Sequence, residues 1–220
     1  MVRDGIYYGV VFSAAGVAMT WVQPWLALPL FVLAAFCLYF FRDPERDIPS
    51  GPVAVSPADG KVVAVRPEGP SQRRVSIFLN IFDVHVNRTP IAGTITGVQY
   101  QKGRFLVASK EKASAQNEQN TVVVEGNGTR VIFKQIAGLI ARRIVFNKKP
   151  GDQVAAGERV GLIKFGSRVD VVFGPEWEIL VREGMRVAAG SSVLARRNVT
   201  QPARESSAQV SSLEPVACQG

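Results

Sequence analysis

Few side chains in this sequence can do chemistry, and three of them stand in well-marked segments. His85 is the only histidine and lies in IFLNIFDVHVNRTP, Asp59 precedes a glycine in SPADGKV, and Ser167 follows Gly166 in KFGSRVDVVF. A histidine can act as a general base, a carboxylate can orient it, and a serine hydroxyl becomes a useful nucleophile when a base takes its proton. Each segment is ordinary by itself, because Asp-Gly and Gly-Ser pairs mostly make turns.

The apolar alternation around His85 predicts a strand. It places Asp83, His85 and Asn87 on one face and the intervening apolar residues on the other, so we expect His85 on a polar face. Asp83 then competes with Asp59 as the carboxylate that orients the imidazole.

Composition restricts the class of protein. The chain has 220 residues, 47% of them apolar, a formal net charge of +8 and a pI near 9.9. The charge fits nucleic acid, an anionic membrane surface or an anionic substrate, and does not choose among them. Nucleic-acid binding lacks further support, because no basic stripe with interleaved aromatic residues is present. Cys37 and Cys218 are the only cysteines, so neither a structural disulfide nor a metal site is expected.

The first 41 residues are predicted to form a hydrophobic, membrane-anchoring helical hairpin. The nearly uncharged run from Ile6 to Phe41 is interrupted at Gln23-Pro24, and each part would reach roughly 25 Å as a helix, against about 30 Å for a bilayer core. Arg residues flank both ends but not the centre, which predicts that both ends lie on the cytoplasmic side. A cleaved signal peptide fits less well, and whether the hairpin spans the bilayer or only dips into it stays open.

Residues 42–197 are predicted to form one mainly β domain, a compact sandwich or barrel. Short Val- and Ile-rich runs alternate with Gly and Pro, and GDQVAAGERVGLI from Gly151 is echoed by GMRVAAGSSVLA from Gly184. Such hairpins are typical of biotinyl- and lipoyl-carrier domains, although the lysine tip of a carrier is missing here. A short helix is expected around Arg142 to Phe146, and a disordered polar tail over residues 198–220.

Six ordered motifs together resemble a known family. They are FFRDPERDIP, SPADGKV, NIFDVHVNRTP, KGRFLVASKEKASAQNEQN, QIAGLIARRIV and GERVGLIKFGSRVDV. In this order they are similar to the short, membrane-associated form of the phosphatidylserine decarboxylase proenzymes. The resemblance covers nearly the whole chain, to about Leu194.

The resemblance implies that the chain cuts itself between Gly166 and Ser167. The Ser167 hydroxyl attacks the preceding carbonyl, the resulting ester is eliminated to dehydroalanine, and hydrolysis leaves a pyruvoyl group and ammonia. The family's triad maps onto Asp59, His85 and Ser167. Asp83 stays open as the alternative orienter, although side chains two apart on a strand point in parallel, which favours Asp59.

The resemblance also implies conversion of phosphatidylserine to phosphatidylethanolamine and carbon dioxide through a Schiff base on the pyruvoyl group, with His85 returning the proton. Neither an external cofactor nor a metal is expected. The partners would be the lipid, an anionic membrane and the two fragments of the chain, 1–166 and 167–220, with a higher oligomer left open. The expected location is the cytoplasmic side of the cell membrane.

Basic residues are candidates for contacts to the substrate or the membrane. Arg88, close to His85, is a candidate partner for a carboxylate or phosphate of the substrate. Possible headgroup contacts come from five residues, namely Arg42, Arg46, Arg104, Lys110 and Lys112.

Two other functions stay open from the sequence. A pyruvoyl enzyme for a soluble amino acid such as aspartate would not need the hydrophobic hairpin. A non-catalytic, membrane-tethered scaffold of the biotinyl type predicts an intact bond between Gly166 and Ser167.

Overall fold

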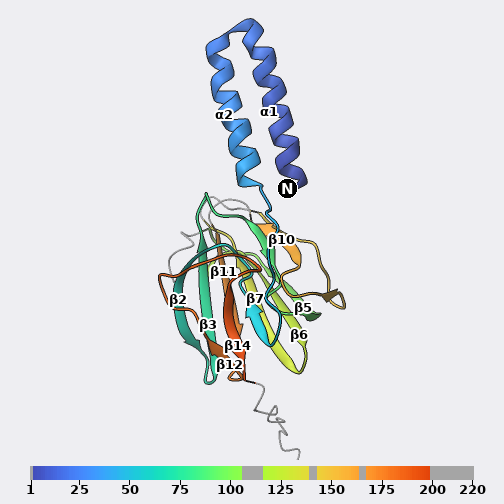
Figure 1. Cartoon of the computed structure of the whole chain (residues 1–220), viewed down its shortest axis with the longest axis vertical. Coiled ribbons are helices and arrows are strands. Elements are labelled where there is room, and N and C mark those ends of the chain that lie inside the picture. Colours follow the sequence, from blue (N-terminus) through green and yellow to red (C-terminus); the bar gives the residue numbers. More distant parts are fainter. Residues whose placement is uncertain (1, 106–115, 139–142, 164–166, 199–220) are drawn as a thin grey trace, which may run out of the picture.

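The computed structural model describes residues 2–105, 116–138, 143–163 and 167–198. Two antiparallel helices, α1 (Arg3–Val22) and α2 (Pro24–Phe40), stand at one end of a β domain (Figure 1). The predicted fold class, mainly β with an N-terminal helical pair, is confirmed.

The two helices turn sharply and pack closely. Gln23 is extended, and Pro24 opens α2 at a position where its missing N–H costs nothing. Three glycines of α1 lie close to α2 and the residue after it. A side chain at Gly5 would clash with Phe41, one at Gly9 with Leu38, and one at Gly16 with Phe31. By length and composition the stretch Asp4–Val22 could cross a membrane, while α2 is shorter.

The β domain contains fourteen described strands in three sheets. Their bounds are β1 (Val53–Val55), β2 (Gly60–Glu68), β3 (Gln72–Leu79), β4 (Val86–Arg88), β5 (Gly93–Gln101), β6 (Gln119–Gly126), β7 (Thr129–Ile136), β8 (Ile144–Phe146), β9 (Gln153–Val154), β10 (Arg159–Ile163), β11 (Ser167–Phe173), β12 (Trp177–Ile179), β13 (Arg186–Val187) and β14 (Val193–Arg197). The large sheet has the order β13-β2-β3-β11-β7-β6-β5-β9, and the small sheets are β1-β14-β12 and β4-β10-β8.

This strand order has an internal two-fold equivalence. We call β1–β3 with β11–β14 half A, and β4–β10 half B. Each half contributes one small sheet and four strands of the large sheet, in mirrored order about the β11–β7 pair. Half B is therefore inserted between the two parts of half A along the chain.

Backbone hydrogen bonds repeat between the halves. The Gly190 N–H donates to Ser56 O in half A, and the Gly157 N–H donates to Thr89 O in half B, both at 2.8–2.9 Å. Both glycines lie in the repeated segments and have positive φ, a conformation that glycine adopts without steric cost. The turns they contact also match in sequence, SPADGKV in half A and TPIAGTI in half B. This second repeat was not predicted from the sequence.

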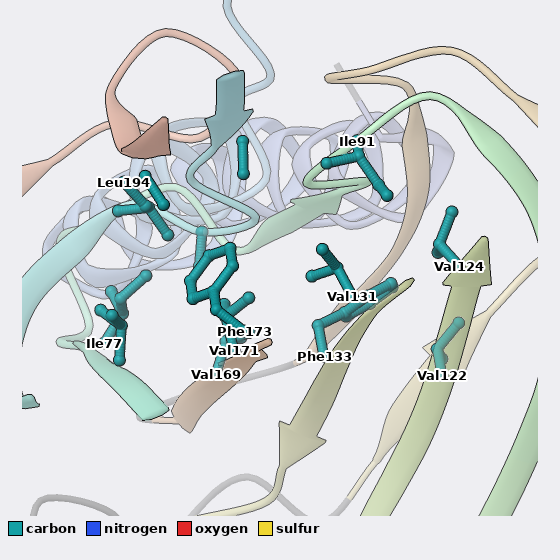
Figure 2. Packing of buried hydrophobic residues seen from close by; sticks show 14 of the residues in the cluster. Ile77, Ile91, Val122, Val124, Val131, Phe133, Val169, Val171, Phe173 and Leu194 are labelled. Carbon is teal, nitrogen blue, oxygen red and sulfur yellow. The ribbon is translucent and has the colours of Figure 1, made fainter. Parts of the chain in front are cut away.

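The core lies between the large sheet and the two small ones. Valine and isoleucine side chains of β3, β7 and β11 meet Phe133 and Phe173, with Ile91 and Leu194 closing the opposite side (Figure 2). Alternation along β11 directs Val169 and Val171 into this core, which explains the continuous Val-rich run in the sequence.

Two local predictions were wrong. Residues 80–85 form a turn and an extended segment instead of a strand, because Asn80 and Asp83 bond across the turn, and His85 is buried instead of lying on an open polar face. Ile144–Phe146 is strand β8 instead of a helix, because these β-branched and aromatic residues pair with β10. The predicted tail beyond Asn198 and the predicted helix's first residue, Arg142, lie outside the described residues.

Candidate active site

The candidate site lies where the chain passes between the two halves. It passes from half A to half B through residues 80–85, and returns through residues 164–166. His85 ends the first connection and Ser167 begins the strand after the second. The last residue of β10 bonds to the end of the first connection, since the Ile163 N–H donates to His85 O at 3.3 Å. Gly166 itself lies outside the described residues.

His85 is oriented as a base. Its Nδ1 lies 2.8 Å from Asp83 O, and since a carbonyl oxygen can only accept, Nδ1 carries the proton. The neutral ring then has its lone pair on Nε2, which is buried and has no partner among the described residues. The Phe40 ring, from the last turn of α2, packs on the imidazole with centroids 4.2 Å apart.

The surroundings of His85 favour its neutral form. Burial lowers its pKa from 6.5 to about 4, Asp83 O and the negative charge of Asp59 act in the opposite direction, and Arg42 adds to the lowering. Because the pKa lies below neutrality, the imidazole is free to accept a proton at pH 7.

Ser167 is fully buried at the start of β11. It pairs with Leu79, the last residue of β3, and its Oγ has no partner among the described residues. A buried hydroxyl without a partner is costly, so this atom is a candidate for a reaction instead of a structural contact. The two described strands that flank Gly166, β10 and β11, belong to different sheets.

Asp59 lies beside the site without bonding directly to His85 in this structure. Both of its carboxylate oxygens accept from Arg46, at 2.8 and 3.0 Å, and Oδ1 also accepts from Ala189 N at 2.7 Å. Its charge still reaches His85, whose pKa it raises. Its catalytic role stays a prediction.

Asp83 uses its carboxylate elsewhere. Oδ2 accepts from Asn80 N at 2.9 Å, and Oδ1 lies 3.4 Å from a guanidinium nitrogen of the exposed Arg186. Only its backbone carbonyl contacts the imidazole. The Asp83 carboxylate therefore stabilises the turn. The alternative contact between this carboxylate and the imidazole is replaced by a contact from the Asp83 backbone carbonyl.

The basic residues near the site mostly bind the segment that follows α2. Arg88 is buried and donates to Asp43 Oδ1 at 2.9 Å, Pro44 O and Gly157 O. Burial lowers its pKa, against the raising effect of Asp43. A role for Arg88 toward the substrate stays a prediction, as do membrane contacts of Arg42, Arg46 and Arg104, whereas Lys110 and Lys112 lie outside the described residues.

Sequence reasoning missed two residues that touch the candidate catalytic groups. Arg46 pairs with Asp59, and Phe40 covers His85. Both belong to the FFRDPER motif, which was used for the family resemblance and for predicted membrane contacts but not for the site. This motif joins the helical hairpin to the site, so the end of the hairpin forms part of the site's wall.

A chain of buried amides beside Ser167 was also missed. Asn120 Nδ2 donates to Gln135 Oε1 at 3.0 Å, and Gln135 Nε2 donates to Asn87 Oδ1 at 2.9 Å. Gln135 pairs with Val169, so on the same sheet face it is a diagonal neighbour of Ser167. The Asn87 Nδ2 group is buried without a described partner, and it is a spare donor near the site.

The residue after Ser167 fixes the strand from its other face. The Arg168 side chain is buried and donates to Asp170 Oδ1 and Ser76 Oγ, each at 2.6 Å. These charge-assisted bonds link β11 to β3 at the first residues of the strand. They restrict the backbone that carries Ser167.

Comparison with known proteins identifies the family. The sequence model of the family described as phosphatidylserine decarboxylase matches residues 33–195. The chain belongs to the phosphatidylserine decarboxylase family. A relative from Solibacter usitatus (strain Ellin6076), named phosphatidylserine decarboxylase proenzyme, is 69% identical over 198 residues, which cover 90% of this chain and 97% of the relative.

More distant members of the family bear the same name. The protein from Magnetococcus marinus is 46% identical over 87% of this chain and 90% of its own length, and that from Salinibacter ruber is 45% identical over 86% and 90%. Membership confirms the resemblance drawn from the six motifs, and with it the decarboxylase class of enzyme. It does not favour the soluble-amino-acid enzyme or the non-catalytic scaffold.

Within the described residues, no group of three or more His, Cys, Asp and Glu side chains is arranged to bind a metal ion. The expectation that the enzyme needs no metal stays a prediction.

Proposed function

We propose that this chain cuts itself between Gly166 and Ser167 and then decarboxylates phosphatidylserine to phosphatidylethanolamine at the cytoplasmic face of the cell membrane. The observation that carries the proposal is the pair of buried atoms without partners, Ser167 Oγ and His85 Nε2, at the two connections between the halves. Family membership gives the reaction class.

In the cut, His85 Nε2 removes the proton of the Ser167 hydroxyl, and Oγ attacks the Gly166 carbonyl carbon. The peptide C–N bond breaks as the ester C–O bond forms, leaving an amine on residue 167. Loss of the residue-167 Cα proton and of the Gly166 carboxylate then gives dehydroalanine, which water hydrolyses to a terminal pyruvoyl group and ammonia. Asp59 stabilises the imidazolium electrostatically during the proton transfer.

The site suits a pyruvoyl group at position 167. The Ser167 side chain is fully buried, it lies on the core face of β11, and the spare Asn87 donor and the neutral His85 lie in the same region of the domain. When formed, the group supplies an electron-accepting carbonyl that makes loss of carbon dioxide from an amino acid headgroup feasible. His85 then supplies the proton that replaces the lost carboxylate.

The two fragments are expected to stay together after the cut. The small fragment contributes β11, which lies between β3 and β7 in the large sheet, and β14, which pairs with β1. Every one of these partner strands belongs to fragment 1–166. Separating the fragments would break these ladders and open the core, so the mature enzyme is a heterodimer of its own pieces.

Anchoring by the helical hairpin, residues 1–41, fits a substrate that stays in the bilayer. Exposed apolar residues cover both helices, including Trp21 and Trp25 at the far tip. Flanking arginines at the domain end favour the cytoplasmic side. The catalytic domain, residues 42–197, then meets the headgroups directly.

Intact-mass analysis of the purified wild-type protein beside Ser167→Ala tests the cut. We expect two wild-type fragments that meet at Gly166/Ser167, the smaller one beginning with a pyruvoyl group, and an uncut Ser167→Ala chain. The matched control is Ser191→Ala at a half-buried turn position of half A, which should be cut normally. Conversion of phosphatidylserine in vesicles by the wild type, and its absence in Ser167→Ala, tests the reaction; an uncut, inactive wild-type chain would overturn the proposal.

A further inference from the structure

The turn Asn80–Asp83 presents two apolar side chains beside the end of the helical hairpin. Ile81 is 38% exposed and Phe82 is 63% exposed, although both belong to a segment that leads directly into the buried His85. Figure 1 shows that the end of β3 that leads into this turn points toward the helices. We call residues 80–83 the apolar turn.

The apolar turn is bonded to the anchor. The Phe82 carbonyl oxygen accepts from the Arg42 guanidinium at 2.8 Å and from the Tyr39 hydroxyl at 3.4 Å, and Arg42 also lies over the Tyr39 ring at 3.9 Å. Tyr39 belongs to the last turn of α2. The exposed apolar surface of the helix therefore continues onto the domain at Phe82.

The turn is braced internally, so its side chains project from a fixed backbone. Asn80 Oδ1 accepts from Phe82 N at 2.7 Å, and Asp83 Oδ2 accepts from Asn80 N at 2.9 Å. The exposed Arg186 pairs with Asp83, which places a second cation beside the apolar tip. Apolar tips flanked by cations are typical of segments that enter the interface of an anionic bilayer.

We propose that the apolar turn is a second membrane-contacting element, which inserts Ile81 and Phe82 into the interface of an anionic phospholipid bilayer next to the anchor. The inference rests on the proposed membrane anchoring. Because Asp83 O bonds His85 Nδ1, insertion also fixes the distance between the bilayer surface and the catalytic base. The turn thus orients the site toward headgroups, a task that the anchor alone does not perform.

Depth measurement tests the insertion without using activity. A fluorophore is placed on Phe82→Cys, and in a matched protein on Leu180→Cys, both with Cys37→Ala and Cys218→Ala, in vesicles that contain an anionic lipid. Leu180 is 42% exposed and directly follows β12, a strand that lies at the end of the domain away from the helices (Figure 1). We expect spin-labelled lipid to quench the probe at 82 but not at 180, and iodide to do the reverse. Equal iodide quenching at both positions would overturn the proposal.

A second measurement separates insertion from folding. Phe82→Ser and Leu180→Ser should both be cut at Gly166/Ser167 and should both act normally on a short-chain phosphatidylserine below its micelle concentration. On phosphatidylserine in vesicles, Phe82→Ser should lose about tenfold in activity, as expected from the loss of one apolar insertion, and Leu180→Ser should not. Equal activity of both variants on vesicles would also refute the proposal, whereas an inactive wild type refutes only the decarboxylase assignment and leaves the depth measurement to decide.

Discussion

The two halves of the β domain share a backbone but differ in their chemistry. In half A the turn SPADGKV carries Asp59, and in half B the matching turn TPIAGTI has the exposed Ala92 at that place. At the segment before each turn, half B carries the candidate residue, His85, and half A has Pro52 at the matching place. Ile163 N donates to His85 O in half B, and the matching bond in half A runs from Arg197 N to Pro52 O.

Half A thus supplies two candidate catalytic residues, Asp59 and Ser167, and the segment before β4 of half B supplies His85. The counterparts of Asp59 and His85 in the other half, Ala92 and Pro52, carry no ionisable side chain. The insertion of half B into half A creates two connections between the halves, and His85, which ends the first, bonds to Ile163, the last residue of β10. The candidate site therefore lies at the junction of the two halves, where segments that are not equivalent by the internal repeat come together. Half A is also divided by the proposed cut, while half B stays within one fragment.

The largest expected effect comes from exchanging the residues that distinguish the turns. Asp59→Asn should slow the cut by about 10³–10⁴-fold, since a neutral amide cannot stabilise the imidazolium of His85. Ala92→Asp, its counterpart in half B, should be cut at the normal rate, and so should Asp83→Asn. The measurement is the fraction of uncut chain by intact mass over time. Normal cutting of Asp59→Asn together with an uncut Asp83→Asn would assign the orienting role to Asp83.

The contact between the anchor and His85 should control the acid limit of the cut. Maturation needs a neutral imidazole, so the wild-type rate should fall only as the pH approaches about 4. Phe40→Ala exposes the ring and should raise its pKa, which moves the acid limb upward by about one pH unit. Phe41→Ala is the matched control, because Phe41 packs in the same cluster but contacts Phe40 edge-on. An identical pH profile for both variants would contradict the role of Phe40.

The same pKa shift has a consequence for stability. The pKa of His85 in the folded protein is below its unfolded value of 6.5. Above pH 6.5 the ring is neutral in both states, so its burial costs no free energy of deprotonation there. As the pH falls from 6.5 toward about 4, the unfolded state binds a proton first, and stability is lost. Urea unfolding of uncut Ser167→Ala at several pH values should show this loss, which the further variant His85→Gln should lack.

Glycine substitutions test whether the two turns are mechanically equivalent. A side chain at Gly60 would meet Phe78 O, and one at Gly93 would meet Glu125 O, so each change to Ala should destabilise the uncut protein by about 1–3 kcal/mol. Gly60 has the additional strain of a positive φ, and Gly69→Ala, at positive φ in open space, isolates that cost. Urea midpoints measure all three. A tolerated Gly93→Ala beside a damaging Gly60→Ala would break the equivalence.

The smallest expected effect concerns the residue that contacts both halves. Ile48 lies against Gly157 of half B and Gly190 of half A. Ile48→Ala should lower the stability of the uncut protein by about 1 kcal/mol, because the side chain is 39% exposed and only part of its burial is lost. Ile6→Ala, on the exposed surface of α1, is the control. An unchanged urea midpoint for Ile48→Ala would show that the glycine turns do not need this bridge.

Much of this protein could be read from local sequence. The hydrophobic run broken at Gln23-Pro24 gave the helical pair, the Val-rich runs gave a β domain, and the glycine repeat gave two matching turns. Ser167, His85 and Asp59 were candidates because their motifs, in order, resemble one family. The segment around His85 was misread, since its alternation resembles a strand while Asn80 and Asp83 close a turn.

The sequence by itself determined most of the element types, the repeated glycine turns and the candidate catalytic residues, because these depend on local periodicity and on motifs. Only the tertiary structure decided that half B is inserted into half A, that the end of β10 bonds to His85, and that Phe40 and Arg46 belong to the site. Those features depend on contacts between residues far apart in the chain. The burial of His85 and Ser167 follows from the same contacts, and neither composition nor spacing records it.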